Sequence, residues 1–248
     1  MMSRREVETV NPYGGSDDKS RQVEQMFDSI APAYDFMNRA MTLGIDKCWR
    51  RVAVNSLRDA RPRHVLDLAT GTGDFALALL RRLSPERVTG VDLSAGMLDV
   101  ARRKAEQRGV QDKVTFLKGD CLDLPLEAAS VDAVTIAFGV RNFADLDRGY
   151  REMARVMKGG ARLVVLELST PVNPIIRWFY KLYAMHIIPF IGGLKSGDRE
   201  AYRYLPRSIA AVPQADDMLE LMRLAGFENC RYRHLTLGTC TLYTAVKP

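Results

Sequence analysis

The chain has 248 residues, 47% of them hydrophobic, so it can bury a full core as one large domain or two small ones without disulfides or metals. It has no apolar run that could span a bilayer, no signal-peptide pattern at its charged start, and no metal-ligand spacing among four cysteines and three histidines, so we expect a cytoplasmic protein without a metal. The net charge of +6 would suit nucleic acid or an anionic membrane, but no dense basic run is interleaved with aromatic residues, and we expect no nucleic-acid partner.

The N-terminal part of the chain predicts an arm followed by a helical lid. Residues 1–20 are expected to be a flexible arm, because residues 11–18 are rich in Asn, Pro, Gly, Ser and Asp. Residues 21–62 predict helices that begin after Ser20 and near Lys47. Between these helices, Tyr34, Asp35 and Asn38 are polar groups in an apolar segment. They either cap a turn or line a ligand pocket from a lid.

From residue 63 to residue 248, short apolar strands alternate with helices, which is typical of a parallel sheet covered on both faces. A helix over residues 145–157 is expected to be stopped by Gly159 and Gly160. Residues 170–213 break the alternation and predict a substrate-cap insertion, and strands at 228–235 and 239–246 predict an antiparallel hairpin. Five parallel strands and such a hairpin form the seven-stranded, Rossmann-like α/β sheet of class I S-adenosylmethionine-dependent methyltransferases. The parallel strands are expected to begin at His64 and to occupy residues 87–91, 113–117, 131–137 and 162–168.

The first strand ends in a small-residue loop, residues 70–74, that leads into a helix. Gly71 and Gly73 would let the backbone turn sharply and approach a ligand, and the helix N-terminus would offer free N–H groups. The spacing Gly71-x-Gly73-x-x-Ala76 also fits a dinucleotide fingerprint. An NAD-dependent oxidoreductase is therefore one alternative.

Carboxylates at the strand ends favour S-adenosylmethionine over a dinucleotide. Asp67 lies in the strand before the loop, where it would repel a pyrophosphate and attract a cation. Asp92 ends the next strand, roughly 20 residues on, where a ribose-binding acid belongs. Asp120 follows the third strand and would either accept from an adenine amino group or cap a helix, and the Cys121 backbone could add a contact. A ligand with a ribose and a cationic sulfonium but no phosphate is S-adenosylmethionine.

From about residue 22 to its end, the chain resembles the ubiquinone/menaquinone biosynthesis C-methyltransferase family. The resemblance implies methylation of a ring carbon of a polyprenylated quinol, and members that act on demethylmenaquinol are the most similar. The ubiquinone intermediate, or another lipid or phenol, is the alternative substrate. The implied cofactor contacts come from Thr72, Asp92, Asp120 and Cys121, and Ala137 stands where members often have Ser or Gly. The specific motifs are Tyr34-Asp35-x-x-Asn38, Phe138-Gly139-Val140-Arg141-Asn142, Leu166-Glu167-Leu168-Ser169-x-Pro171 and Tyr202-x-Tyr204-Leu205-x-x-Ser208-Ile209.

Methylation of a quinol carbon requires an electron-rich ring, so a hydroxyl with a pKa near 10 should ionise as the methyl group moves. A fixed cation would stabilise the phenolate, and Arg141 is the candidate. The alternative role for Arg141 is an ion pair with a neighbouring acid. The base is open between Tyr34, Asp35, Tyr202 and water.

Residues 175–191 are densely aliphatic and aromatic. They predict either an ordinary core-packed helix or a cap that grips a prenyl tail and touches the inner face of the membrane. The sequence leaves prenyl length and oligomeric state open.

Overall fold

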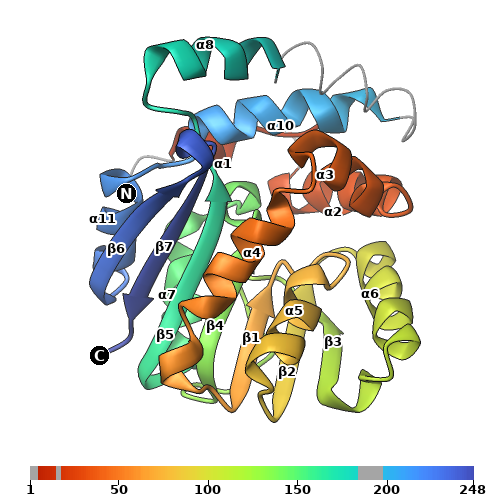
Figure 1. Ribbon diagram of the computed structural model, residues 1–248, viewed down its shortest axis with the longest axis vertical. Coiled ribbons are helices and arrows are strands. Elements are labelled where there is room, and N and C mark those ends of the chain that lie inside the picture. Colours follow the sequence, from red (N-terminus) through yellow and green to blue (C-terminus); the bar gives the residue numbers. More distant parts are fainter. Residues whose placement is uncertain (1–4, 15–17, 184–197) are drawn as a thin grey trace.

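The computed structural model describes residues 5–14, 18–183 and 198–248. A seven-stranded sheet in the order β3-β2-β1-β4-β5-β7-β6 forms the central layer, with helices on both faces (Figure 1). Strands β1 to β5 are parallel, and β7 pairs antiparallel with both β5 and β6. This topology confirms the predicted fold class. The strands are β1 (His64–Leu68), β2 (Arg87–Asp92), β3 (Val114–Lys118), β4 (Val131–Ala137), β5 (Met157–Leu168), β6 (Glu228–Leu235) and β7 (Cys240–Val246).

Two apolar layers sandwich the sheet. Leu66 and Leu68 of β1 pack in the layer that contains α7 (Leu146–Val156) and α11 (Asp216–Leu224). Val65 points to the opposite layer, because side chains alternate along a strand. That second layer contains α4 (Asp46–Asn55), α5 (Asp74–Leu83) and α6 (Ala95–Gln107). Burial on both faces explains why β1 reads as a continuous buried run.

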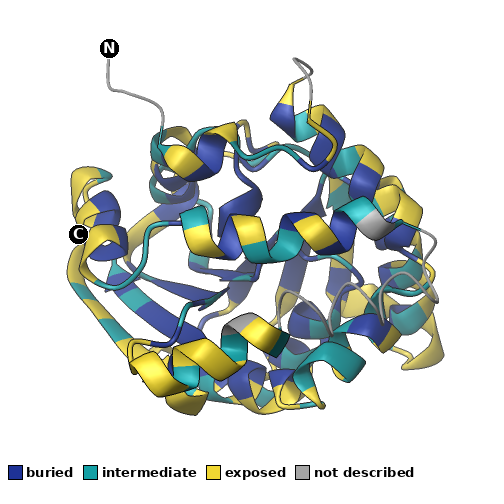
Figure 2. Ribbon diagram, turned by 90° about the horizontal axis from the view of Figure 1, so that it is seen from above, coloured by how far each residue is buried: buried dark blue, intermediate teal, exposed yellow. Residues whose placement is uncertain are grey.

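A third layer covers the carboxyl ends of the parallel strands. It consists of α2 (Lys19–Ile30), α3 (Tyr34–Thr42), α8 (Pro174–Leu182) and α10 (Arg199–Ala211) (Figure 1). Met26 and Met37 pack against Tyr204 in one apolar cluster, which joins the N-terminal helices to the insertion. Seen from above, the helices carry exposed residues on their outer faces, while most of the sheet is buried (Figure 2). Residues 184–191 of the expected cap lie outside the described residues.

The expected ends of the N-terminal arm and of the helical lid do not match where the helices pack. The expected lid reached residue 62, yet α4 packs against the sheet, where Trp49, Ala53 and Leu57 join the core cluster of Val65. The expected arm reached residue 20, yet α1 (Glu6–Thr9) is packed, because Val7 is fully buried in the core. Residues 1–4 and 15–17 of that arm lie outside the described residues.

The junction between α7 and β5 also differs from the expectation. The helix ends at Val156, and β5 begins at Met157, before the two glycines that were expected to stop the helix. Gly160 lies inside the strand with a φ of +77°. The glycines therefore belong to a long strand, not to a helix terminus.

Candidate active site

The loop after β1 has a backbone that requires glycine. Gly71 and Gly73 have φ values of +56° and +76°, in the left-handed region. A Cβ at Gly73 would lie 3.0 Å from both the Ala101 Cβ and the Phe116 Cζ, so a side chain would also clash with α6 and β3. The turn places the start of α5 beside the loop.

Asp92 holds this loop from the end of β2. Its Oδ2 accepts a 2.8 Å hydrogen bond from the Gly71 N–H, and its Oδ1 accepts a 2.9 Å bond from the Ser94 N–H. The Ser94 hydroxyl in turn accepts from the Met97 N–H, which confirms Ser94 as the N-cap of α6. Burial raises the pKa of Asp92 to about 6. Asp92 is therefore a buried carboxylate that both shapes the loop and faces a cavity.

A cavity of about 620 Å³ lies beyond the ends of β1, β2 and β4. Gly71, Asp92, Asp120 and Cys121 line it, so the structure brings four of the expected cofactor residues together. Burial raises the pKa of the Cys121 thiol, which stays neutral. Apolar walls that sequence reasoning did not single out come from Phe27, Leu93, Met97, Leu122 and Phe143.

Asp67, Thr72 and Gly73 do not line this cavity. Asp67 lies beneath the loop, where it accepts from the Thr70 hydroxyl at 2.6 Å and from the Thr135 hydroxyl at 2.7 Å. Burial raises its pKa to about 6. Asp67 thus stabilises the loop from below.

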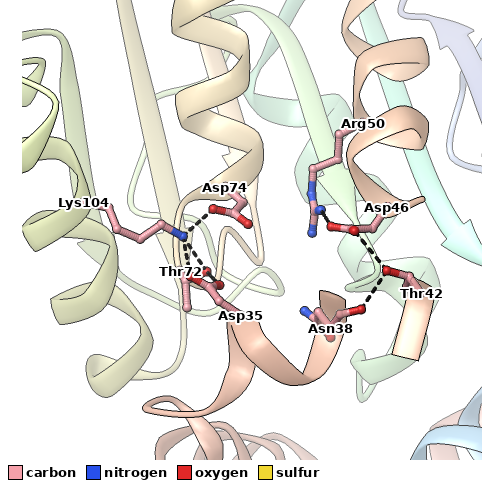
Figure 3. Close-up of polar contacts among 8 residues, drawn as sticks. All are labelled: Asp35, Asn38, Thr42, Asp46, Arg50, Thr72, Asp74 and Lys104. Carbon is pink, nitrogen blue, oxygen red and sulfur yellow. Dashed lines mark hydrogen bonds and ion pairs between the residues drawn. The ribbon is translucent and has the colours of Figure 1, made fainter. Parts of the chain in front are cut away.

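A polar cluster, which we call the lysine cluster, contains Lys104, Asp35, Thr72 and Asp74 (Figure 3). The Lys104 Nζ lies 2.8 Å from an Asp35 oxygen and 3.2 Å from the Thr72 hydroxyl, and it also pairs with Asp74. Burial raises the pKa of Asp74, but Lys104 outweighs it and holds that pKa below its usual value. The cluster ties α3 to α5, α6 and the loop.

A second, more apolar cavity of about 1110 Å³ lies beside the first. Tyr34 and Phe138 line both cavities and form the wall between them. Phe138 has a φ of +62°, a strained conformation for a bulky residue and one that recurs at functional sites. Other lining residues include Asn38 and Met41 of α3, Trp49 of α4, Tyr180 of α8, Tyr183 directly after α8, and Leu205 and Ile209 of α10.

Arg141 lines this second cavity and is 6% exposed. Its Nη1 lies 2.9 Å from the Glu167 Oε1 and also donates to the Phe138 carbonyl. The ion pair that we considered as an alternative role is therefore present. The Arg141 Nε is buried and has no hydrogen-bond partner among the described residues. The side chain thus keeps an unused donor beside the cavity.

The expected candidates for the base are poorly suited or engaged elsewhere. Burial raises the pKa of Tyr34, although a hydrogen bond from Asn38 partly lowers it, so the phenol stays protonated at neutral pH. Asp35 is held by Thr72 and Lys104. Tyr202 is buried in the cluster with Met26 and lines neither cavity.

Sequence reasoning missed Asp46 and Arg50, which line the second cavity and form an ion pair on α4. Arg50 is 9% exposed, and its guanidinium carbon lies 5.3 Å from the centre of the Phe138 ring. The available signal was the separation of four positions between Asp46 and Arg50, which places an acidic and a basic side chain on one helix face. Nothing in the local sequence indicates that this face is buried.

A sequence model of the ubiE/COQ5 methyltransferase family matches residues 16–247. The chain belongs to this family. It is 47% identical to a demethylmenaquinone methyltransferase of Bacteroides fragilis over 97% of the chain and 98% of that protein. It is 41% identical to a ubiquinone/menaquinone biosynthesis C-methyltransferase of Geotalea daltonii over 93% of the chain and 98% of that protein.

The ubiE/COQ5 fold also occurs in more distant structures. The [4+2]-cyclase SpnF superposes with a TM-score of 0.67 at 20% identity, over 92% of this chain and 96% of that one. Membership of the ubiE/COQ5 family decides between the two cofactors considered above. The chain is an S-adenosylmethionine-dependent methyltransferase.

Proposed function

We propose that the chain transfers the methyl group of S-adenosylmethionine to a ring carbon of demethylmenaquinol, in the biosynthesis of menaquinone. One observation carries this proposal: a cavity lined by four expected cofactor residues and a larger apolar cavity meet at the wall formed by Tyr34 and Phe138. Methyl transfer requires donor and acceptor carbons in contact and in line. The name of the Bacteroides fragilis relative supports demethylmenaquinol as the acceptor.

In this proposal the cofactor occupies the smaller cavity. Asp92 accepts hydrogen bonds from the ribose hydroxyls, Asp120 accepts from the adenine amino group, and the Cys121 backbone adds a contact. Gly71 gives the close backbone approach, and Gly73 allows the sharp turn of the loop. Asp67 and Thr72 hold the loop, and the contacts of their hydroxyl and carboxylate groups support this indirect role.

Arg141 and Tyr34 serve the acceptor. The guanidinium of Arg141 stabilises the phenolate that develops on the quinol, in a largely apolar cavity. Tyr34 stays protonated and positions the ring and the methyl group at the wall. The raised pKa of its phenol supports positioning over proton abstraction.

We also propose that the enzyme meets its lipid substrate at a membrane surface. No helix of the described residues is long and apolar enough to cross a bilayer. Trp178 and Phe179 of α8 are 58% and 61% exposed, and Leu43 at the mouth of the larger cavity is 83% exposed. Beside Leu43, a groove lined by cations supports contact with anionic lipids. Among the described residues, the cations that line it are Arg39, Lys47, Arg50, Arg51, Arg81, Arg82 and Arg108, and Asp74 is the one acidic residue in the lining.

The test is product analysis. The purified enzyme is incubated with S-adenosylmethionine and either demethylmenaquinol or the unmethylated polyprenyl-methoxy-benzoquinol of ubiquinone biosynthesis, each kept reduced. We expect a product heavier by one methylene unit with demethylmenaquinol. Turnover of the benzoquinol alone would replace the proposed substrate, and turnover of both would show dual specificity, as the name of the Geotalea daltonii relative suggests for that protein.

A further inference from the structure

Among the described residues that line the larger cavity, Asp46 is the single carboxylate. It is the first residue of α4 and is 2% exposed. The other titratable groups that line the cavity are two arginines, which are always charged, and three tyrosines. Those groups are Arg50, Arg141, Tyr34, Tyr180 and Tyr183.

Asp46 is held in place without using all of its acceptor capacity. The Thr42 hydroxyl lies 3.0 Å from its Oδ1 and shares its proton between this oxygen and the Asn38 carbonyl at 2.7 Å (Figure 3). The Arg50 Nη1 pairs with its Oδ2 (Figure 3). An ionised carboxylate has about four lone-pair sites, so a further donor can bind. Arg50, which also lines the cavity, has a buried Nε without a hydrogen-bond partner among the described residues.

We propose that Asp46 is the general base that accepts the hydroxyl proton of the acceptor, and that Arg50 positions it. This inference rests on the proposed quinol substrate. Asp35 and Glu167 are also held by hydrogen bonds and ion pairs, but neither of them lines the larger cavity. Asp92 and Asp120 line the smaller cavity, which the proposal assigns to the cofactor. Asp46 combines burial, fixed geometry and access to the cavity.

The step balances as follows. The quinol O–H bond breaks, its proton bonds to an Asp46 oxygen, and the electron pair stays on the quinol oxygen. The electron pair on the quinol oxygen then forms a carbonyl, and a π electron pair of the ring forms the new bond to the methyl carbon. The sulfur–methyl bond breaks at the same time, and its electron pair stays on sulfur. The methylated ring carbon then loses its hydrogen to water, and Asp46 returns its proton to the oxygen. The products are the methylated quinol, S-adenosylhomocysteine and one proton.

The alternative role for Asp46 is purely structural, as a buried partner for Arg50. The variant Asp46→Asn keeps the shape and removes the base. We expect kcat to fall by about 10²–10⁴-fold at pH 7, the usual contribution of a general base. We also expect unchanged affinity for S-adenosylmethionine, and a rate that rises with pH as more quinol ionises in solution. Asp46→Glu should restore much of kcat, because it restores a carboxylate.

The control is Asp99→Asn, which breaks an exposed ion pair with Arg102 and should leave kcat unchanged. A normal kcat for Asp46→Asn overturns the inference, as does a reduced kcat with the wild-type pH profile and a lower Tm. If Asp46→Asn fails to fold, Asp46→Asn with Arg50→Gln removes both buried charges, and normal turnover by that double variant overturns the inference. Absence of product from the wild type with any quinol overturns the substrate proposal as well, whereas normal turnover by both wild type and Asp46→Asn overturns this inference alone.

Discussion

The hydroxyl of Thr72 donates a 2.6 Å hydrogen bond to the carboxylate of Asp35, and this bond ties the cofactor loop to α3 (Figure 3). The family resemblance implied that Thr72 contacts the cofactor. In the structure its hydroxyl faces the lysine cluster. Because Asp35 is adjacent to Tyr34, the bond fixes the position of the aromatic wall between the two cavities.

Thr72→Val should weaken cofactor binding modestly. The variant keeps the shape and removes one hydrogen bond, which contributes about 0.5–1.5 kcal/mol, or roughly 2- to 13-fold in Kd. Isothermal titration with S-adenosylmethionine measures the change, with Thr115→Val on the exposed side of β3 as the control. A loss above 100-fold would contradict the indirect role and indicate that the hydroxyl binds the cofactor.

Asp92→Ala should weaken cofactor binding more strongly. The change removes an ionised acceptor for the ribose and also releases the Gly71 and Ser94 N–H groups. A hydrogen bond to a charged group contributes about 1.5–3 kcal/mol. Titration of the folded variant measures the loss, and an unchanged Kd would exclude Asp92 from the site. In the wild type, affinity should also fall as the pH drops through about 6, the pKa at which Asp92 takes up a proton.

Asp67→Asn should stabilise the fold at neutral pH. The pKa of Asp67 is about 6 in the folded chain and about 3.9 in an unfolded one, because burial disfavours the charge. The folded state therefore binds the proton more tightly, and the stability that this gives below pH 4 is lost as the pH rises through 6. An asparagine is neutral throughout and avoids this loss, which amounts to at most about 3 kcal/mol at pH 7.

Thermal melts of both proteins from pH 4 to pH 8 test this sign. The Tm of Asp67→Asn minus that of the wild type should increase as the pH rises. Asp92 titrates equally in both proteins and does not affect this difference. A constant difference in Tm would show that the carboxyl of Asp67 does not titrate in this range.

Arg141→Lys should lower kcat while the affinity for S-adenosylmethionine stays unchanged. Lysine keeps the charge but cannot serve Glu167, the Phe138 carbonyl and a phenolate together. Loss of one oriented donor to an oxyanion typically lowers kcat by about 10²–10³-fold. Steady-state kinetics measure this, with Arg155→Lys in a more exposed ion pair as the control. Normal turnover with a lower Tm would leave Arg141 with only its structural ion pair.

The double variant Trp178→Ala with Phe179→Ala should bind anionic vesicles more weakly than the wild type. Both side chains are exposed, so the Tm should not change. Tyr180, on the opposite side of α8, lines the larger cavity, and Tyr180→Ala should raise KM for long-tailed quinols more than for short ones. Vesicle sedimentation and a tail-length series separate the two effects. A KM penalty independent of tail length would assign Tyr180 to ordinary packing.

Most of the sheet could be predicted from the sequence, because its signals are local. Apolar runs bounded by glycine or by polar residues gave β4 and β6 to the residue, and the others within a few residues, apart from the start of β5. The backbone N–H of Gly71 and the carboxylate of Asp92 meet because the parallel strands that precede them end at the same edge of the sheet. Strand order and glycine spacing are sufficient to predict that meeting.

The remaining site residues depend on contacts between distant segments. Thr72 meets Lys104 and Asp35 only after α3 and α6 have packed around the loop. The burial of Asp46 and Arg50 follows from the position of α4 against the sheet, and nothing in their local sequence indicates it. The exposure of Trp178 and Phe179 is similarly invisible in a sequence whose apolar residues are typical of a core.

The position of β7 has a consequence for biosynthesis. β7 is the last strand in chain order, yet it lies between β5 and β6 and pairs with both. During translation, β5 therefore keeps an open edge until Cys240–Val246 has been made, and an open apolar edge pairs readily with other chains. A chain truncated before residue 240 would leave that edge of β5 open, and we expect it to aggregate more readily than the full chain.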